Sequence, residues 1–198
     1  MITNSLLQTT FEQALAFAKY VATATPHQQH AWNHFDSLSR EKAPLSPAQI
    51  ELVRSFTRRV NILVLSGAWC GDCVHQCPLL QQLGELSPVS SVGMIDLRFI
   101  DRDEASELAH AAMICGGLRA PTAIFMNEDF DFVSILGDRS LTRYRAMAAK
   151  ALGASCPLPG APVPADEIAA TRQDWLNELE RVHLLLRLSP KLRQRYGD

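Results

Sequence analysis

The fold is decided by the stretch Asn61-Ile62-Leu63-Val64-Leu65-Ser66-Gly67-Ala68-Trp69-Cys70-Gly71-Asp72-Cys73. Residues 61–67 form a short apolar run rich in β-forming side chains, which predicts a strand buried on both faces. The cysteines follow at once and open a helix that we expect to reach about Leu86, because Ser87-Pro88 ends it. In a reducing compartment, a cysteine pair this close is more often catalytic or metal-binding than structural.

Three further strands and two further helices are predicted after this stretch. The strands are 92–100, 122–127 and 130–136, and the helices are 104–115 and 139–152. The last two strands are separated only by Glu128-Asp129, and so short a connection makes them antiparallel. This order predicts an α/β fold in which helices flank a four-stranded mixed sheet on both sides.

The first sixty residues are predicted to be helical. Apolar residues at helical spacing predict one half-buried helix, and they are Leu7, Phe11, Leu15, Ala18 and Ala22. Thr25-Pro26 and Ser46-Pro47 each combine a capping hydroxyl with a proline in the first turn, so two more helices should begin there. We therefore treat residues 1–60 as a helical N-terminal extension of a core at 61–152.

The C-terminal segment, residues 153–198, is predicted to pack on the core through one helix. Residues 153–164 form a loop rich in proline, which breaks regular structure. Residues 166–188 have one apolar side and predict an amphipathic helix. The basic residues Lys191, Arg193 and Arg195 are expected to form a solvated tail.

The composition excludes several classes of protein. The chain has 198 residues, of which 47% are hydrophobic, so it should be globular and not disordered. Lys and Arg number 19 against 21 Asp and Glu, and this near-neutral balance lacks the basic bias of a nucleic-acid-binding protein. No apolar run approaches the roughly 18 residues of a membrane helix, and the first residues do not form a secretion signal. We therefore expect a cytoplasmic protein whose partners include neither nucleic acid nor a membrane.

The two cysteines should differ in ionisation and accessibility, because they occupy different positions at the start of the helix. Unpaired backbone N–H groups and the positive end of the helix dipole favour a thiolate at Cys70. The thiolate is the nucleophilic form of cysteine, so Cys70 is the predicted nucleophile. Cys73 lies one turn further into the helix and should be less accessible.

The motif Trp69-Cys70-Gly71-Asp72-Cys73, between a strand and a helix, resembles the redox motif of the thioredoxin superfamily. Within the superfamily, it looks most like thioredoxin-like proteins that carry a helical N-terminal extension. Pro78 lies where such proteins kink the active-site helix, and Gly137 also has a counterpart. Arg119-Ala120-Pro121-Thr122 resembles the loop whose proline is cis and faces the cysteines. The resemblance covers roughly residues 61–152.

This resemblance implies a thiol–disulfide oxidoreductase with Cys70 and Cys73 as catalytic residues. Cys70 attacks a substrate disulfide and forms a mixed disulfide, which Cys73 then resolves. The residues implied to contact the substrate are Trp69, Gly71, Asp72, Ala120 and Pro121. The implied partners are protein disulfide substrates and a reductase or other electron donor. No cofactor or metal is expected beyond the redox-active Cys70–Cys73 disulfide.

The sequence departs from the family pattern at two positions. Thioredoxins commonly bury an acid beneath the cysteines, and the matching residue here is Val64. Asp72 stands where many thioredoxins carry proline, and its carboxylate opposes a nearby thiolate but favours the start of a helix. Arg119 either offsets Asp72, if it points toward Cys70, or faces water.

Cys77 shares a helical face with the cysteine pair and has three candidate roles. It is an apolar filler beneath the site, a third redox thiol, or a metal ligand. The spacing C-x-x-C-x-x-x-C-P matches the tail of a ferredoxin cluster motif, for which Cys115 or His75 would have to supply the missing ligand. We favour the filler. Cys115 is expected to pack at a helix end, and Cys156 to be an isolated loop thiol.

Two other polar clusters are interpreted without a metal. His27, His30 and His34 share a helical face at metal-ligand spacing, and we interpret them as a solvated face. The acidic run 101–104 is interpreted as a loop that caps the next helix, not as a magnesium site.

A different class of function also stays open. It is a non-catalytic redox sensor or interaction module with a thioredoxin fold, whose cysteines would change their redox state once without turning over substrate.

Overall fold

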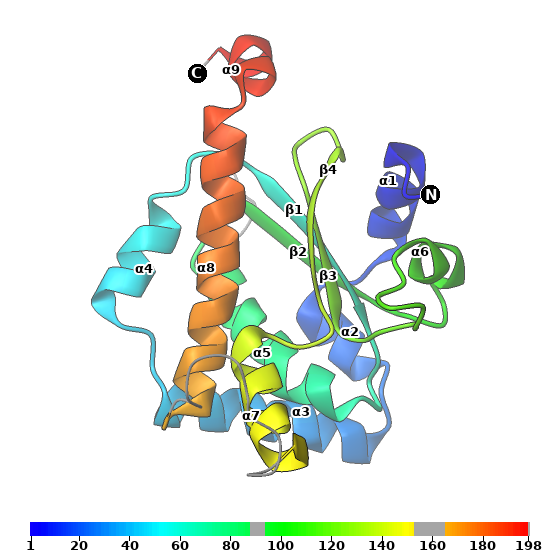
Figure 1. Ribbon diagram of the computed structural model, residues 1–198, viewed down its shortest axis with the longest axis vertical. Helices are drawn as coiled ribbons and strands as arrows, with labels where there is room; N and C mark the ends of the chain where they lie inside the picture. Colours follow the sequence, from blue (N-terminus) through cyan, green and yellow to red (C-terminus); the bar gives the residue numbers. More distant parts are fainter. Residues whose placement is uncertain (88–93, 153–164, 198) are drawn as a thin grey trace.

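The structure is a computed structural model that describes residues 1–87, 94–152 and 165–197. These residues contain a four-stranded sheet with the strand order β2-β1-β3-β4 (Figure 1). The strands are β1 (Val60–Ser66), β2 (Ile95–Asp101), β3 (Thr122–Met126) and β4 (Phe132–Gly137). β1 is parallel to β2 and antiparallel to β3, and β3 is antiparallel to β4. The predicted mixed α/β sheet is confirmed.

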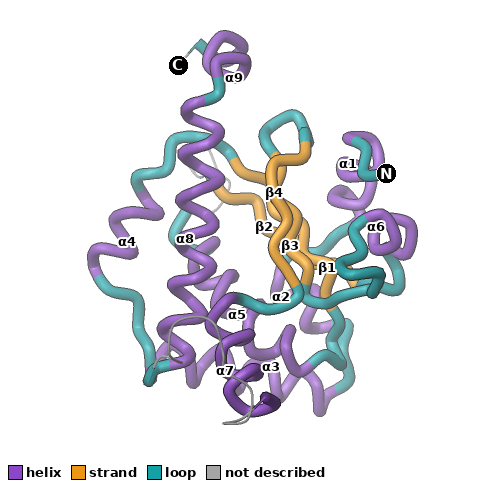
Figure 2. The backbone as a smooth tube through the Cα atoms, in the orientation of Figure 1, coloured by secondary structure: helices purple, strands orange, loops and turns teal. Residues whose placement is uncertain are grey.

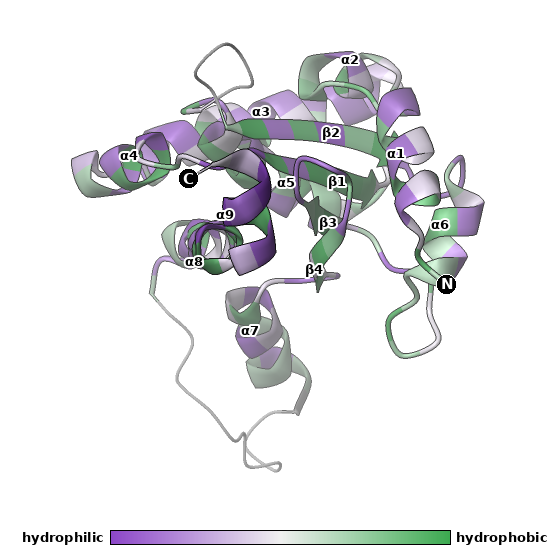
Figure 3. Cartoon of the chain, turned by 90° about the horizontal axis from the view of Figure 1, so that it is seen from above, coloured by the Kyte–Doolittle hydropathy of each residue, from purple (hydrophilic) through white to green (hydrophobic). Residues whose placement is uncertain are grey.

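Strand β1 lies inside the sheet and is buried along its whole length. Figure 3 colours most of β1 and β3 as hydrophobic, whereas the edge strand β2 alternates between hydrophobic and hydrophilic residues. A strand covered by helices on both faces needs apolar side chains in both directions, and the run 61–67 supplies them. The cysteine motif therefore follows a rigid strand that is shielded from water.

Helices cover both faces of the sheet (Figures 1 and 2). Those described are α1 (Asn4–Gln13), α2 (Phe17–Ala22), α3 (Pro26–Lys42), α4 (Pro47–Arg54), α5 (Gly71–Gly84), α6 (Ser106–Ala111), α7 (Leu141–Leu152), α8 (Glu167–Leu188) and α9 (Pro190–Tyr196). One hydrophobic cluster joins α2, α3, α5 and α8 to one face, and a second joins α1 and α6 to the other. The side chains of β1 alternate between the two clusters, since Ile62 and Val64 enter the first and Leu63 enters the second.

The first predicted helix is two helices in the structure. Between α1 and α2, the backbone of Leu15 forms a bridge to Phe99 of β2. The N–H of each of these residues donates to the carbonyl of the other at 2.8 Å. The apolar spacing predicts one continuous helix because it does not register a backbone bridge to a distant strand. The next two helix starts are confirmed, since Thr25 and Ser46 each form a complete capping box.

Two other predicted boundaries also differ from the structure. The helix expected at 104–115 is shorter, because α6 ends at Ala111. The turn before β4 is longer than two residues, because the side-chain oxygen of Asn127 accepts hydrogen bonds from the N–H groups of Asp129 and Asp131. Because of these bonds, β4 begins at Phe132 and not at residue 130, and the turn contains more residues than Glu128 and Asp129 alone.

The predicted C-terminal helix is confirmed as α8, whose first turn is capped by the Asp166 side chain. The last residues form a helix, α9, and not an irregular tail, although Lys191, Arg193 and Arg195 are exposed to solvent as predicted. Leu192 is buried, and Arg195 pairs with Asp129. The predicted loop at 153–164 lies outside the described residues. Among the helices that the structure describes, none is long and apolar enough to cross a membrane.

Candidate active site

The cysteine pair lies at the junction of β1 and α5, as predicted. Cys70 is the N-cap residue of α5, and Cys73 lies in the first turn of this helix. Cys70 is half-buried, Cys73 is fully buried, and both are free thiols. Their side chains are close enough to hydrogen-bond to each other. The structure therefore brings together one sulfur that solvent can reach and one that it cannot.

The loop before β3 faces the accessible sulfur. The peptide bond between Ala120 and Pro121 is cis, as the resemblance implies. The thiol of Cys70 donates to the carbonyl oxygen of Ala120 at 3.4 Å. Gly137 backs this loop, because a Cβ atom at that position would lie 2.8 Å from the carbonyl oxygen of Pro121. Any side chain at 137 would therefore push the loop away from its place beside Cys70.

Trp69 presents an exposed aromatic ring beside the cysteine pair. The residue is 53% exposed, although it is large and apolar. The guanidinium of Arg102 lies over the ring, 4.9 Å from its centroid, and donates to the carbonyl oxygen of Leu118 at 3.2 Å. This cation–π contact holds the ring in place. Sequence reasoning identified Trp69 but missed Arg102, which supports it.

The charge of Asp72 is balanced by two arginines that follow β4. Nη2 of Arg139 lies 2.5 Å from one carboxylate oxygen of Asp72, and Nη2 of Arg143 lies 2.9 Å from the other. Burial raises the pKa of Asp72, but hydrogen bonds from Arg143 and Arg139 outweigh burial, so the pKa lies below its ordinary value. Arg119 does not offset Asp72, because its guanidinium lies 3.6 Å from the carboxylate of Asp138.

Opposing influences act on the proton of Cys70. The neighbouring Cys73 thiol and burial raise the pKa of Cys70, and together they outweigh the backbone N–H groups of Asp72 and Cys73, which lower it. The helix start thus acts in the direction predicted from the sequence, but the net direction is the opposite. The thiol form of Cys70 is therefore the dominant form near neutral pH.

The inner side of the cysteine pair is apolar except for a few thiol and hydroxyl groups. Cys77 is 1% exposed and belongs to the larger hydrophobic cluster, which agrees with its predicted role as a filler. Its sulfur lies 3.9 Å from the hydroxyl oxygen of Ser66. Val64 is fully buried and apolar, so no carboxylate occupies the position where thioredoxins commonly place an acid.

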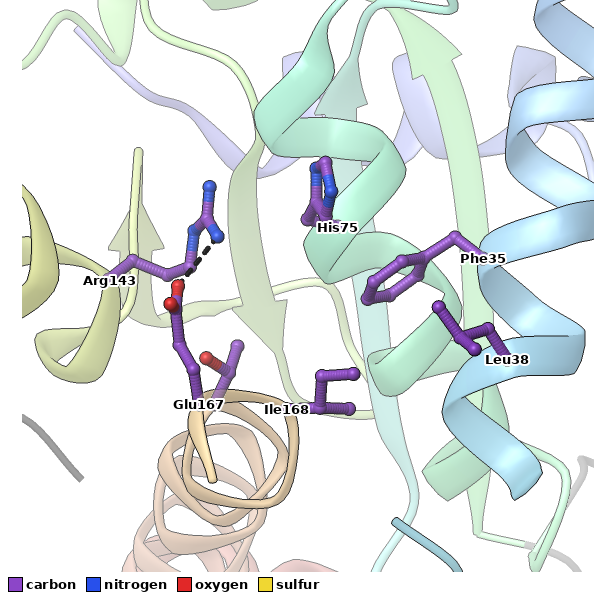
Figure 4. Close-up of a pocket in the computed structure, with 7 residues that line it drawn as sticks. Phe35, Leu38, His75, Arg143, Glu167 and Ile168 are labelled. Atoms are coloured by element: carbon purple, nitrogen blue, oxygen red, sulfur yellow. Dashed lines mark hydrogen bonds and ion pairs between the residues drawn. The ribbon is translucent and has the colours of Figure 1, made fainter. Parts of the chain in front are cut away.

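A cavity of about 310 Å³ borders the exposed side of α5 (Figure 4). Its lining residues are Phe35, Leu38, His75, Arg143, Glu167, Ile168 and Thr171. Arg143 links this cavity to the cysteine motif, because it pairs with Glu167 at 2.8 Å and with Asp72 at 2.9 Å. The imidazole of His75 hydrogen-bonds to the carbonyl oxygen of Gly71 at 2.7 Å. The first turn of α5 is thus tied on its outer side to α7 and α8.

In residues 1–87, 94–152 and 165–197, no group of three or more His, Cys, Asp or Glu side chains is placed to hold a metal ion. His30 and His34 are exposed, and their rings stack with centroids 6.2 Å apart. Asp101 accepts a hydrogen bond from the backbone of its own loop. Cys115 is exposed and has a left-handed backbone with φ 50°, so the prediction that it packs at a helix end is wrong. Cys156 lies outside the described residues.

The sheet order, the cysteine pair at the start of α5 and the proline loop that faces it define a thioredoxin-like protein. A family model described as thioredoxin matches residues 14–151, and the chain therefore belongs to the thioredoxin family. The match begins well before residue 61, where the resemblance in the sequence starts. It therefore includes most of the helices that precede β1.

Two solved structures are similar to the chain in fold. One is a protein of unknown function from Pseudomonas aeruginosa, with 18% sequence identity, a TM-score of 0.68, and coverage of 92% of this chain and 97% of that chain. The other is an HIV epitope-scaffold, with 17% identity, a TM-score of 0.64, and coverage of 87% and 93%. At these identities, the likeness shows the fold alone. No curated protein matches the chain.

Proposed function

We propose that the protein is a thiol–disulfide oxidoreductase that exchanges disulfides with protein substrates through Cys70 and Cys73. The observation that carries this proposal is the unequal burial of two neighbouring thiols. Cys70 is half-buried beside the Pro121 loop, and Cys73 is fully buried behind it. Such a pair lets one sulfur meet a substrate and keeps the other for the second step. Membership of the thioredoxin family supports the same chemistry.

The reaction consists of two exchanges. Cys70 loses its proton and attacks one sulfur of the substrate disulfide, so that a bond forms between Cys70 and the substrate. The other substrate sulfur leaves as a thiolate and takes up a proton. Cys73 then loses its proton and attacks the sulfur of Cys70, which forms the Cys70–Cys73 disulfide and releases the second substrate thiol. The substrate gains two electrons and two protons, and the protein dithiol loses them.

The surroundings of Cys70 suit an extended protein segment as substrate. The exposed ring of Trp69 offers an apolar contact. The segment at Ala120 and Pro121 offers backbone groups with which an extended chain can pair. Gly71 faces open space, since a Cβ atom there would meet no atom within 4 Å. The carboxylate of Asp72 is neutralised by its two arginines and therefore repels an approaching acidic segment only weakly.

The proposal is tested with insulin as the disulfide substrate and dithiothreitol as the reductant. We expect the wild-type protein to reduce many disulfides per molecule and Cys70→Ser to be inactive. Cys73→Ser should accumulate a mixed disulfide on Cys70, because the second exchange is blocked, and mass spectrometry detects this species. Cys115→Ser is the matched control, since it removes an exposed thiol outside the site and should keep wild-type activity.

The outcomes separate this function from its alternatives. Oxidation of the pair without turnover would identify a redox sensor in place of an enzyme. Equal activity in the wild type, Cys70→Ser and Cys73→Ser would refute the assignment of both residues. Proteins captured from a cell extract by Cys73→Ser, and absent with the Cys70→Ser variant, would name the substrates.

A further inference from the structure

A second cavity lies beside the cysteine motif, on the side of the N-terminal helices. It has a volume of about 320 Å³ and lies between α2, the end of β2 and the loop after β1. Ala68 and Trp69 line it, and they directly precede Cys70 in the chain. Consecutive residues are only about 3.8 Å apart, so the cavity begins close to the sulfur that we assign as the nucleophile.

The walls of this cavity are held in place by hydrogen bonds between distant parts of the chain. Leu15 and Phe99, which both line the cavity, each donate a backbone N–H to the carbonyl of the other at 2.8 Å. The indole N–H of Trp32 in α3 donates to the carbonyl oxygen of Ala68 at 3.1 Å. The cavity is therefore formed before any ligand arrives, and the helical extension supplies part of its wall.

Aromatic rings form much of the wall. Trp69 is exposed, whereas Tyr20 and Phe99 are buried, and the rings of Tyr20 and Phe99 stack on each other. Such a surface suits the aliphatic part of a long side chain, and ring faces attract cations. The hydroxyl of Tyr20 makes no hydrogen bond of ordinary geometry to the described residues. Buried polar groups are normally paired, so this hydroxyl is a group that a bound donor can satisfy.

The charge of the cavity is negative. Among the described residues that line it, the charged ones are both acidic, namely Asp101 and Glu104. Oδ1 of Asp101 accepts a hydrogen bond from the backbone N–H of Asp103 at 2.9 Å, which orients this carboxylate. The basic residue of the same loop, Arg102, pairs with Asp103 at 2.8 Å and lies over the ring of Trp69. Its charge is thus balanced by Asp103, and the two carboxylates of the lining favour a cation from outside.

We propose that this cavity is a subsite that binds a lysine or arginine side chain of the protein substrate, next to the disulfide that Cys70 attacks. This inference rests on the proposed function. The aliphatic part of the side chain lies against Trp69 and Phe99, and its cationic end meets Asp101 and Glu104. An extended chain advances about 3.3 Å per residue, so we expect the basic residue about two to four positions from the substrate cysteine.

Two other occupants match the cavity less well. A metal ion needs several ligands at one point, and no group of three or more His, Cys, Asp or Glu side chains in the described parts of the chain is placed to hold one. An acidic side chain would be repelled by the two carboxylates. An uncharged apolar side chain suits the aromatic wall but leaves the carboxylates unused, so it serves as the reference in the experiment.

The subsite is tested with short peptides in which a single cysteine is joined by a disulfide to thionitrobenzoate. The thiolate of Cys70 attacks the peptide sulfur, and the bond to thionitrobenzoate breaks. Coloured thionitrobenzoate leaves with the bonding electron pair, so stopped-flow absorbance gives the second-order rate constant. Cys73 then displaces the peptide thiol. All proteins carry Cys115→Ser and Cys156→Ser, so that these thiols outside the site do not react.

The peptides differ at one test position, which is moved along the chain on either side of the cysteine. The test residue is lysine, norleucine or glutamate, and norleucine matches the aliphatic part of lysine without its charge. At the best position, we expect the lysine peptide to react about fivefold faster than the norleucine peptide, and the glutamate peptide to react more slowly than both. Added salt should reduce the advantage of lysine, because it screens partly exposed charges.

The protein variant that tests the two carboxylates is Asp101→Asn combined with Glu104→Gln. The advantage of lysine over norleucine should fall to about twofold or less in this double variant. The ratio of the two rate constants cancels any general effect of the substitutions on Cys70. Asp129→Asn is the matched control, because it removes an acid in the turn between β3 and β4, and it should keep the full advantage of lysine.

The outcomes distinguish a failure of the subsite from a failure of the proposed function. Equal rate constants for the lysine and norleucine peptides at every test position would overturn the subsite. An advantage of lysine that persists unchanged in the double variant would place recognition of the cation elsewhere and would also overturn it. If no peptide released thionitrobenzoate from reaction with the wild-type cysteine pair, the proposed exchange activity itself would be wrong, and the subsite with it.

Discussion

Two buried titratable side chains lie at opposite ends of β1. Cys73 follows the strand, in the first turn of α5, and His183 of α8 contacts the residues just before it. Burial favours the neutral form of both, because it raises the pKa of Cys73 and, together with the charges of Arg187 and Arg58, lowers the pKa of His183 to about 4. Both side chains are therefore neutral near pH 7.

The two groups differ in what they contact. Nε2 of His183 accepts a hydrogen bond from the backbone N–H of Thr57 at 3.2 Å, and the ring stacks on Phe56 with centroids 4.4 Å apart. These contacts fix the chain where it enters β1. Cys73 instead adjoins a second thiol, Cys70, that solvent reaches. A buried titratable group thus serves structure when a backbone donor occupies its lone pair, and suits chemistry when its neighbours can react or exchange protons.

The largest predicted effect concerns His183 and the dependence of the free energy of unfolding on pH. Folded His183 stays neutral down to about pH 4, whereas an unfolded histidine takes up a proton near pH 6.5. Because the unfolded chain binds the proton first, the free energy of unfolding should fall by about 3 kcal/mol as the pH drops from 6.5 to 4. His183→Gln keeps an acceptor for Thr57 but cannot titrate, so urea unfolding should show a much flatter dependence on pH.

The control for this experiment is His30→Gln, at an exposed position of α3. The free energy of unfolding of this variant should follow the wild-type dependence on pH. If the curve for His183→Gln also ran parallel to the wild type, the folded and unfolded forms of His183 would titrate alike. Burial would then not hold this histidine neutral, and the comparison with Cys73 would fail.

The next prediction concerns the cysteine pair and uses a substitution that shifts the loop facing Cys70. Gly137→Ala places a Cβ atom 2.8 Å from the carbonyl oxygen of Pro121 and 3.0 Å from the Cα atom of Thr122. Both are backbone atoms, so the loop must shift, and we expect the free energy of unfolding to fall by about 1–3 kcal/mol. Reduction of insulin should fall about tenfold, because the Ala120 carbonyl moves away from Cys70.

Gly71→Ala is the stability control for this substitution. A Cβ atom at Gly71 meets no atom within 4 Å, and alanine is a better helix former than glycine. Its free energy of unfolding in urea should therefore equal or slightly exceed that of the wild type. Full turnover of insulin by a folded Gly137→Ala protein would show that the position of the loop does not limit the reactivity of Cys70.

The sequence predicts those parts of the fold that depend on neighbouring residues. The buried strand β1, the start of α5 and the two capping boxes each follow from a few adjacent side chains, and the structure confirms them. The predictions are wrong where a distant contact decides. The bridge from Leu15 to Phe99 divides the first helix, and helical spacing contains no information about this partner. Helix α9 is different, because it begins at a local signal that the prediction overlooked: Ser189 caps the helix and Pro190 follows it.

The candidate site likewise combines residues that a short motif reveals with residues that only the fold brings to the motif. A short motif locates Cys70 and Cys73, and a second one locates Pro121. The residues that set the electrostatics of the motif are joined to it only by the fold, as Arg139 and Arg143 are to Asp72.

The smallest effect is expected at Asp72, whose charge is already balanced. Asp72→Asn removes the carboxylate that Arg139 and Arg143 share, although each arginine keeps a second acidic partner, Asp138 or Glu167. The substitution therefore adds net positive charge near Cys70. Positive charge favours the thiolate, so the pKa of Cys70 should fall, and alkylation of Cys70 by iodoacetamide near neutral pH should become about threefold faster. The free energy of unfolding should change by less than about 1 kcal/mol, because these ion pairs are partly exposed.

Asp72 and His183 should affect the free energy of unfolding in different pH ranges. The arginines hold the pKa of Asp72 below its ordinary value, so the stabilisation that Asp72 contributes is present above about pH 4 and is lost as the pH falls through the lower folded pKa.

The control for the alkylation experiment is Asp129→Asn, which removes an acid in the turn between β3 and β4. This variant should leave the alkylation rate of Cys70 unchanged. Slower alkylation in Asp72→Asn would mean that this carboxylate helps Cys70 to ionise.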